Sequence, residues 1–304
     1  MKLSALLLPL LILTFFSCNN SLPKLDDQGV AIDTVGISIR KIDPLHTRIN
    51  MQDYDASLVE YINSKPNKPT AKKTTIYLLP FGNIKPEIDT IITNELVYLE
   101  LFFQMPVKIL DNVSFEEILE NADIKTRMVP DNDYAYYSEM KGNIAHTQNL
   151  REQIEASSFM TEYMQKHKPA NAVAVLGITE HDIYNPDYNF IFGSSSTKSG
   201  VGVISTYRLV DYGSETTNTI RKVASKQITN LFSIRNVKDY SCLLNFHNNI
   251  TSQMFGEFKL SPRALEKLKY AIGFDYNKRF KELENFWKEE GNLQLEEYYH
   301  KVQE

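Results

Sequence analysis

The segment from residue 172 to residue 234 constrains the fold most, because short apolar runs there are followed by a long amphipathic one. Residues 172–177 read AVAVLG, a continuous apolar run that is typical of a buried strand. Residues 190–193 and 201–209 are further strand candidates, and a loop of small residues, SSSTKSG, separates them. Residues 217–234 repeat apolar side chains at three- and four-residue steps, which predicts a helix with one buried face. Strands that alternate with helices indicate a mixed α/β architecture.

The preceding part of the chain shows the same alternation. Residues 74–82, TTIYLLPFG, predict a first strand, and Pro86 begins an amphipathic helix. MPVKIL at residues 105–110 predicts a second strand. Residues 111–144 are polar and rich in Tyr, which indicates an inserted segment, and residues 150–167 have the pattern of another helix. We therefore expect one layered α/β domain.

The last part of the chain is predicted to be helical. Ser261 and Pro262 have the pattern of an N-cap followed by proline at the first helical position. Residues 279–303 are highly charged and predict a terminal helix with a mostly solvated surface. We therefore place the domain at residues 74–304, with a helical C-terminal extension.

The first residues have the form of a bacterial export signal. Residues 1–17 contain Lys2 and then an apolar run that is too short to cross a bilayer. The run ends at Cys18 in a sequence similar to a lipobox, so we expect lipidation there; the alternative is an ordinary signal with an incidental cysteine. Residues 18–73 are polar and broken by prolines, which predicts a tether, with residues 35–40 as a strand candidate. These features predict a lipoprotein of the cell envelope, facing the periplasm or on the outer-membrane surface.

Composition excludes some partners and chemistry. The formal net charge of −5 at pH 7 argues against nucleic acid as a partner. The chain has two cysteines, and lipidation of Cys18 would leave Cys242 without a partner for a disulfide. Since no nucleophile motif or paired histidine accompanies Cys242, we interpret it as a small buried residue.

Several motifs follow one another between residues 74 and 282. They are TIYLLPFG at 75–82, the R-x-Q of Arg151 and Gln153, GITEHDIYNPDYNFIFG at 177–193, GVISTYRL at 202–209 and LEKLKYAIGF at 265–274. Together they resemble the archaemetzincins, a family of metzincin-type zinc peptidases. The order and spacing of the motifs support the resemblance more than any single match. The resemblance implies a zincin-like mixed, twisted sheet with packed helices.

The resemblance also implies a zinc site built from the pattern HExxHxxGxxHC, in which three histidines bind zinc and the glutamate activates water. In this chain the three ligand positions hold Lys226, Asn230 and Asn236. Gln227 stands at the position of the general base and cannot exchange a proton near neutral pH. Ser233 replaces the turn glycine, so a positive φ is harder to reach there. Zinc is therefore expected for the family, but its ligands are absent, and we assign no catalytic, cofactor-binding or metal-binding residue.

The second, cysteine-based zinc site of the family is also changed. Its C-x4-C-x-M pattern falls on Val237, Cys242 and Leu244, and its later C-P-x-C pattern falls on residues 261–264, which read SPRA. Only Cys242 remains, and one thiolate cannot build a tetrahedral zinc site.

No other histidine pair has the spacing of metal ligands. The six histidines include none at i,i+4 or in an H-x-H pattern. His181 beside Asp182, and His247 after Cys242, are the only suggestive neighbours. We interpret Asp182 as a structural carboxylate in a turn or cap rather than a ligand, and His247 as a polar residue near the end of a strand or turn.

Two interpretations of Lys226, Gln227, Asn230 and Asn236 remain open. In one, they are polar remnants of a site without a role. In the other, the remnant cleft binds an extended peptide at a sheet edge, and Lys226 attracts a carbonyl or carboxylate of that peptide. We expect a membrane-anchored, catalytically inactive archaemetzincin-like protein that binds a peptide or protein or acts as a scaffold. The alternatives are a zinc-dependent peptidase of the same family with displaced ligands, and a purely structural lipoprotein.

Overall fold

The computed structural model describes residues 56–131, 150–210, 212–213, 215–238 and 240–303. The predictions of an export signal, of lipidation at Cys18 and of a strand at residues 35–40 lie outside these residues.

The larger sheet has five strands in the order β2-β1-β5-β8-β7. Its members are β1 (Thr75–Pro80), β2 (Val107–Ile109), β5 (Ala172–Thr179), β7 (Gly193–Ser196) and β8 (Val201–Ser205). Strands β2, β1, β5 and β8 are parallel neighbours, and β7 runs antiparallel to β8 at the edge. Strands β1 and β5 are buried along their whole length, which explains their continuously apolar sequences.

The edge strand β7 corrects the prediction for residues 190–200. We expected a strand at residues 190–193 and a loop through the serines that follow. Instead Ser194 to Ser196 pair with β8, while Ile191 makes only an isolated bridge to Ile183. Pairing with a strand that is already part of the sheet outweighs the low strand propensity of serine.

A smaller sheet has three strands in the order β3-β4-β6. Strand β3 (Thr126–Pro130) is antiparallel to β4 (Leu150–Glu155), and β4 is parallel to β6 (Asp182–Tyr184). The prediction of a helix over residues 150–167 is therefore wrong for its first six residues. Helical structure begins only at residue 156, because pairing with β3 and β6 on both sides holds residues 150–155 extended.

The remaining part of the predicted helix is irregular. It consists of α5 (Ala156–Ser158), a π-helical turn (Phe159–Met164) and α6 (Gln165–His167). This segment packs against Gly177 of β5, where an added Cβ would lie 3.3 Å from atoms of Met164 and Phe159. The wide turn thus fits its side chains against a strand position that has none.

The inserted segment at residues 111–144 is partly regular. It contains α3 (Phe115–Asn121), whose N-cap Ser114 accepts a hydrogen bond from the backbone N–H of Glu117, and strand β3. Residues 132–144 lie outside the described residues.

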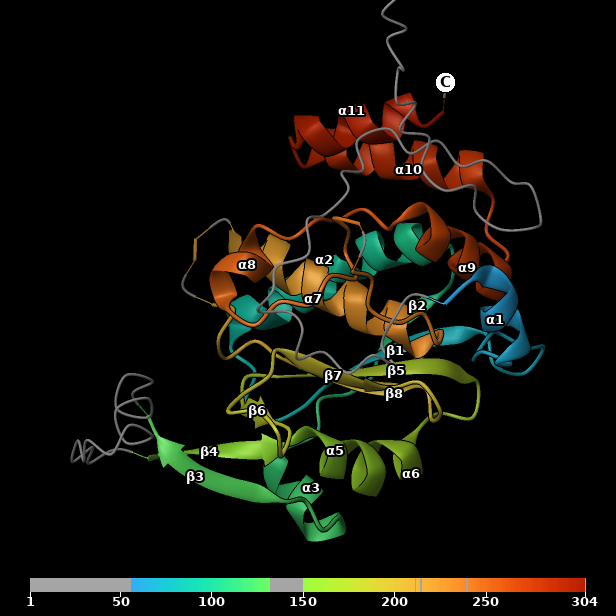
Figure 1. The fold of residues 1–304 in the computed structure, drawn as a ribbon. Helices are drawn as coiled ribbons and strands as arrows, with labels where there is room; N and C mark the ends of the chain where they lie inside the picture. Colours follow the sequence, from blue (N-terminus) through green and yellow to red (C-terminus); the bar gives the residue numbers. More distant parts are fainter. Residues whose placement is uncertain (1–55, 132–149, 211, 214, 239, 304) are drawn as a thin grey trace, which may run out of the picture.

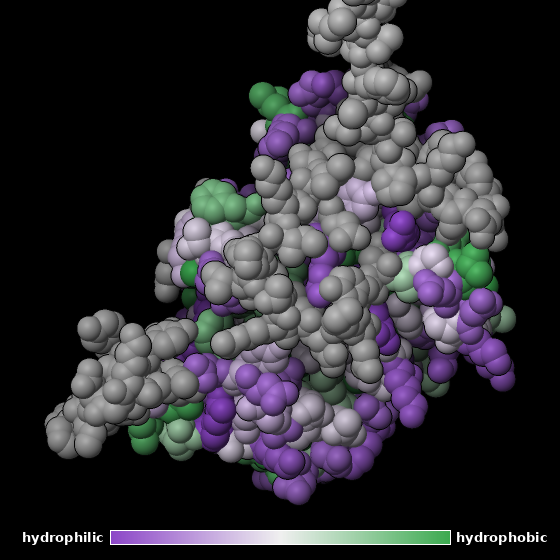
Figure 2. All heavy atoms as spheres, in the orientation of Figure 1, coloured by the Kyte–Doolittle hydropathy of each residue, from purple (hydrophilic) through white to green (hydrophobic). Residues whose placement is uncertain are grey.

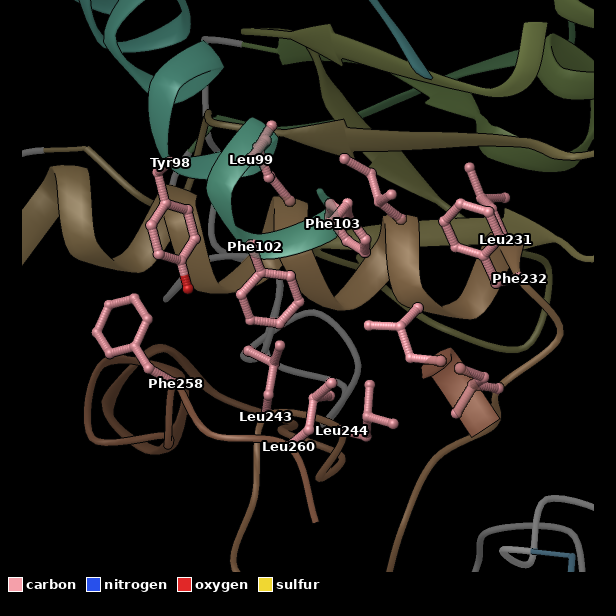
Figure 3. Packing of buried hydrophobic residues seen from close by; sticks show 14 of the residues in the cluster. Tyr98, Leu99, Phe102, Phe103, Leu231, Phe232, Leu243, Leu244, Phe258 and Leu260 are labelled. Atoms are coloured by element: carbon pink, nitrogen blue, oxygen red, sulfur yellow. The ribbon is translucent and has the colours of Figure 1, made fainter. Parts of the chain in front are cut away.

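The helices form layers on the two faces of the larger sheet. Figure 1 shows α2 (Pro86–Phe103), α7 (Glu215–Leu231) and α9 (Pro262–Ile272) on one face, and α5 with α6 on the other. These helices confirm the predicted elements, and Ser261 caps α9 by accepting from the backbone N–H of Ala264. The main core lies between the sheet and the upper helices. Figure 3 shows its central side chains: Tyr98, Leu99, Phe102, Phe103, Leu231, Phe232, Leu243, Leu244, Phe258 and Leu260.

The C-terminal extension contains two packed helices rather than one solvated helix. After the short helix α8 (Ile250–Met254) and α9, the chain forms α10 (Tyr276–Glu289) and α11 (Leu293–Lys301). Gly291, at φ 72°, separates the last two helices. Trp287 and Tyr299 are almost fully buried. The charged sequence hid this apolar face because its members are spaced among many lysines and glutamates.

The segment before β1 also differs from the expected tether. Helix α1 (Leu58–Asn63) begins with a capping box between Ser57 and Glu60. Leu58 and Tyr61 are buried, and the hydroxyl of Tyr61 donates to the carbonyl of Phe232 at 2.6 Å. Residues 56–73 are therefore partly integrated into the domain.

Within the described part of the chain, no helix combines the length and apolar character that a membrane span requires. On the face shown in Figure 2, the lower end of the molecule around α3, α5 and α6 is mostly hydrophilic.

Candidate functional site at helix α7 and strand β7

Helix α7 carries Lys226, Gln227 and Asn230, and Asn236 follows in the loop after it; of the four predicted site residues, Gln227 contacts the edge strand β7. Gln227 approaches Gly193 so closely that a Cβ on the glycine would lie 3.1 Å from the Gln227 Cγ and 2.9 Å from Ile204. Asn230 lies one turn further along the same side of the helix. The helix that carries the predicted site residues therefore packs against the edge of the larger sheet.

Lys226 connects α7 to the loop that follows it. Its side chain is 7% exposed, and its Nζ donates to the carbonyl of Asn245 at 2.6 Å. The side chain of Asn245 accepts from the backbone N–H of Cys242 and donates to the carbonyls of Val237 and Tyr240. Lys226 thus holds the loop; that its charge also attracts a peptide ligand stays a prediction.

Asn230 and Asn236 have a different environment. In each, the carboxamide Oδ1 is buried and has no hydrogen-bond partner among the described residues. Burying such an acceptor without a partner costs about 1–3 kcal/mol, so these two oxygens are unusual in a folded protein. Gln227, which is 7% exposed, supplies a third carboxamide, one turn before Asn230 on α7.

The turn after α7 keeps a left-handed residue although the family's glycine is absent. Ser233 has φ 65°, and its backbone N–H donates to the carbonyl of Asn230 at 2.9 Å. The Ser233 Oγ accepts from the backbone N–H of Asn67 at 3.1 Å. Contacts from residues 56–73, which include the Tyr61 hydroxyl, therefore hold a conformation that serine adopts less readily than glycine.

The residues present do not fit a zinc ion. Lys226 uses its Nζ as a donor to a carbonyl, and the other three positions carry carboxamides rather than the imidazole, thiolate or carboxylate groups that zinc prefers. Across residues 56–131, 150–210 and the described part of 212–303, no group of three His, Cys, Asp or Glu side chains could hold a metal.

Cys242 and His247 behave as ordinary structural residues. Cys242 is fully buried, as predicted, and the Nδ2 of Asn245 lies 3.9 Å from its Sγ. His247 packs beside Gly256, where an added Cβ would lie 2.9 Å from the His247 Nε2.

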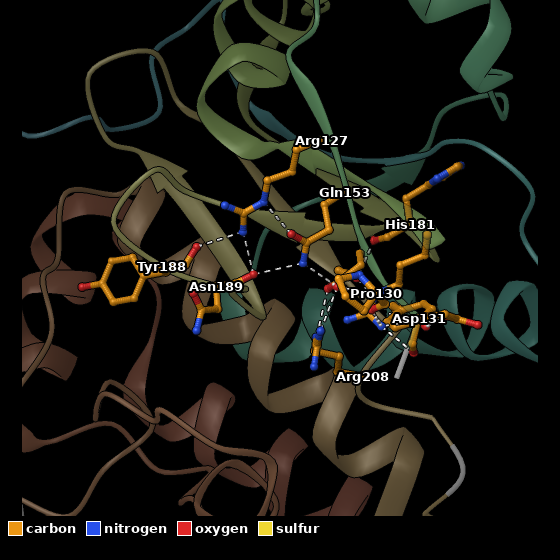
Figure 4. Close-up of polar contacts among 12 residues, drawn as sticks. Arg127, Pro130, Asp131, Gln153, His181, Tyr188, Asn189 and Arg208 are labelled. Carbon is orange, nitrogen blue, oxygen red and sulfur yellow. Dashed lines mark hydrogen bonds and ion pairs between the residues drawn. The ribbon is translucent and has the colours of Figure 1, made fainter. Parts of the chain in front are cut away.

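Asp182 is a structural carboxylate, as interpreted from the sequence, but it begins strand β6 and binds side chains of other elements rather than capping a turn or helix. It is 1% exposed and accepts from the Nε of Arg151 at 3.1 Å, from the Nη2 of Arg208 at 2.8 Å and from Gln153 at 2.6 Å. Figure 4 shows part of this network, which joins the smaller sheet to the turn after β8. The R-x-Q spacing could have indicated it, because alternate residues of a strand point to the same face.

Arg127 and His181 have contacts that the sequence motifs did not indicate. Arg127 extends the network: its guanidinium donates to Gln153 and to the carbonyl of Asn189, and it stacks 3.7 Å from the centre of the Tyr184 ring. Sequence reasoning missed Arg127, which no motif marks. The His181 side chain lies outside this network: its ring centre is 4.5 Å from that of Phe115, and burial lowers the pKa of the imidazole. His181 contacts Phe115, whereas Asp182 binds Arg151, Gln153 and Arg208, so the two neighbours have different partners.

Comparison with known proteins supports the relationship suggested by the motifs. No family model matches the chain. The chain is 26% identical over 254 residues to Archaemetzincin-2 of Mus musculus, which covers 71% of this chain and 64% of the mouse protein. It is 28% identical over 133 residues to Archaemetzincin of Pyrococcus furiosus, which covers 41% of this chain and 69% of that protein. The crystal structure of Archaemetzincin from Methanopyrus kandleri aligns with TM-score 0.48 and 19% identity, over 67% of this chain and 97% of that one.

The chain is a mixed α/β protein in which a long helix lies against an antiparallel edge strand. Its sequence is similar to those of archaemetzincins. It spans about two thirds of the mouse relative, at 64% of that protein's length.

Proposed function

We propose that this protein is an archaemetzincin homologue without zinc-peptidase activity, and that it binds an extended peptide along β7. One observation carries the first half of the proposal. The positions of the three zinc ligands and of the general base hold Lys226, Asn230, Asn236 and Gln227, and Lys226 is committed to the carbonyl of Asn245. These groups supply neither a zinc site nor a base for activating water.

The geometry of β7 supports the second half. Among the described residues, no strand pairs with the outer side of β7. The backbone N–H of Ser205 donates to the carbonyl of Phe192, so these two residues form a hydrogen-bonded pair. Bonded and non-bonded pairs alternate along an antiparallel ladder, and the next bonded pair is therefore Ser194 with Val203. The main-chain groups of Gly193 and Ser195 therefore point away from β8, where an added strand would meet them.

A binding measurement tests the peptide site. The purified full chain in mild detergent is titrated into a fluorescein-labelled pool of degenerate decapeptides with blocked termini, and anisotropy is recorded. We expect binding that Ser195→Pro weakens at least about tenfold, because proline removes the outward N–H. Ser195→Ala, which keeps that N–H, is the matched control and should bind as the wild type does. Absence of binding to the wild-type chain would refute this function.

A metal measurement tests the loss of the peptidase. The full chain, purified without chelators, is offered zinc, dialysed and analysed for its elements. We expect near-zero zinc and no cleavage of the peptide pool. One tightly held zinc per chain would support the alternative, a peptidase with displaced ligands, and His181, Asp182 and His247 would be the first residues to mutate.

We also propose that a lipidated Cys18 anchors the protein in the cell envelope. The support is the sequence of the first 18 residues alone. Cys18→Ala should move the protein from the membrane fraction to the soluble fraction of an expressing bacterium. An unchanged membrane fraction would refute the anchor.

A further inference from the structure

Two carboxamide oxygens, one on α7 and one in the loop after it, are buried and have no hydrogen bond from the described residues. The Oδ1 atoms of Asn230 and Asn236 are buried without a hydrogen-bond partner among the described residues. Nearly all buried polar groups in folded proteins are bonded, so each exception calls for an explanation. Other buried polar atoms, such as the Oε2 of Glu95, also lack a partner among the described residues, but these two fall at positions where the family has zinc ligands. We therefore consider a binding role for them.

The two asparagines belong to one region of the fold. Asn230 lies one turn from Gln227, which contacts Gly193 of β7. Asn236 precedes Val237, whose carbonyl is held by Asn245, and Asn245 in turn is held by Lys226. One network therefore links the chain at Asn236 to the face of α7 that lies near the edge strand.

Neither side chain is held through its Oδ1 by any of the described residues. Asn230 and Asn236 are each only partly buried as whole residues. Because the buried oxygens hold no hydrogen bond, turning them toward a ligand would break no bond of these oxygens. The rotation also removes the cost of the unbonded acceptor. A ligand that donates a hydrogen bond to these oxygens would therefore gain affinity from the unbonded acceptors of the free protein.

The chemistry of the groups limits the ligand. A carboxamide is neutral and has both donors and acceptors, which matches a peptide group better than a charged group. The nearest cation of the site, Lys226, already donates to a carbonyl. No acidic cluster that would attract a metal ion is present among the described residues. Gly193, one of the two residues with outward main-chain groups, contacts Gln227, one turn from Asn230 on α7.

We infer that Asn230 and Asn236 hydrogen-bond the main chain of an extended peptide bound on β7, at the positions from which the family binds zinc. This inference rests on the proposed peptide-binding function and adds its mode of recognition. Because main-chain groups are the same for all residues, recognition is largely independent of peptide sequence. The termini of the peptide take no part.

The experiment measures stability and binding on the same variants. Asn230→Leu and Asn236→Leu are compared with Asn218→Leu, which makes the same change on α7 about two turns before Lys226. Each variant is melted without ligand and titrated with the blocked decapeptide pool. For both site variants we expect a Tm about 2–4 °C higher than that of the wild type and an affinity about tenfold lower. The control should show neither the loss of affinity nor the full rise in Tm.

The outcomes separate the two proposals. If the wild type binds and Ser195→Pro does not, but the asparagine variants bind normally, the inferred role of the asparagines is wrong and the edge-strand function stands. A lower Tm in both site variants would also overturn the inference, since it would show that these carboxamides stabilise the fold. If the wild type binds no peptide, both proposals fail. Equal affinity for several single decapeptides of unrelated sequence would further support main-chain recognition.

Discussion

Replacing Glu95 by glutamine should stabilise the protein at neutral and higher pH. Glu95 of α2 is 2% exposed, and its Oε1 accepts from the Nε of Arg221 at 2.8 Å. Its Oε2 is buried without a partner among the described residues. Arg221 is shared with the carboxylate of Glu290 at 3.0 Å and lies between the rings of Tyr98 and Trp287. The carboxylate of Glu95 is thus desolvated more completely than it is paired.

Burial raises the pKa of Glu95 from its ordinary 4.5 to about 7, against the attraction of Arg221. Between pH 4.5 and about pH 7 the folded state binds more protons than the unfolded state, so the free energy of unfolding falls as pH rises. The stabilising contribution of the protonated carboxyl is complete below about pH 4.5 and is lost by about pH 7. At 1.36 kcal/mol per unit, the difference amounts to about 3 kcal/mol.

Urea denaturation of the wild type and of Glu95→Gln, at several pH values from about 5 to 8.5, measures this difference. The two proteins should have similar stability at the lowest pH, and the variant should be more stable by about 3 kcal/mol at the highest. Glu87→Gln, at an exposed position of the same helix, is the control and should show no such trend. A variant less stable than the wild type at pH 8.5 would show that pairing with Arg221 outweighs desolvation.

Two further substitutions test the turn after α7 and the segment that supports it. Ser233→Val should lower the free energy of unfolding by about 2 kcal/mol, because a β-branched side chain is strained at φ 65° and cannot accept from Asn67; unchanged stability in urea would contradict the left-handed turn. Tyr61→Phe should cost about 1–2 kcal/mol, since it leaves the buried carbonyl of Phe232 without its 2.6 Å donor. A Tyr61→Phe chain that melts like the wild type would mean that this hydrogen bond contributes nothing measurable to stability.

Local patterns in the sequence predicted much of the larger sheet and its helices. The continuous apolar runs predicted β1 and β5, which are buried along their whole length. The N-cap at Ser261 predicted the start of α9. The order of the motifs predicted the family relationship, and the register assigned Lys226, Gln227, Asn230 and Asn236 to the family's zinc-ligand and base positions. Each of these depends on neighbouring residues along the chain, which is why sequence alone could determine them.

Other features depended on partners that are distant in the sequence. Residues 150–155 have a helical pattern but form β4, because β3 and β6 supply hydrogen bonds on both sides. Ser194 to Ser196 form an edge strand because β8 pairs with them. Ser233 keeps a positive φ in a turn where contacts from Asn67 and Tyr61 hold the chain.

The same distinction applies to the candidate site. The sequence determined which residues occupy the positions of the zinc ligands and of the general base. Only the tertiary structure decided that Lys226 holds the loop through Asn245, whereas Asn230 and Asn236 bury oxygens without partners. Hydrogen bonding and desolvation depend on which groups meet in space, and a linear pattern specifies the residues at a site without specifying what each one contacts.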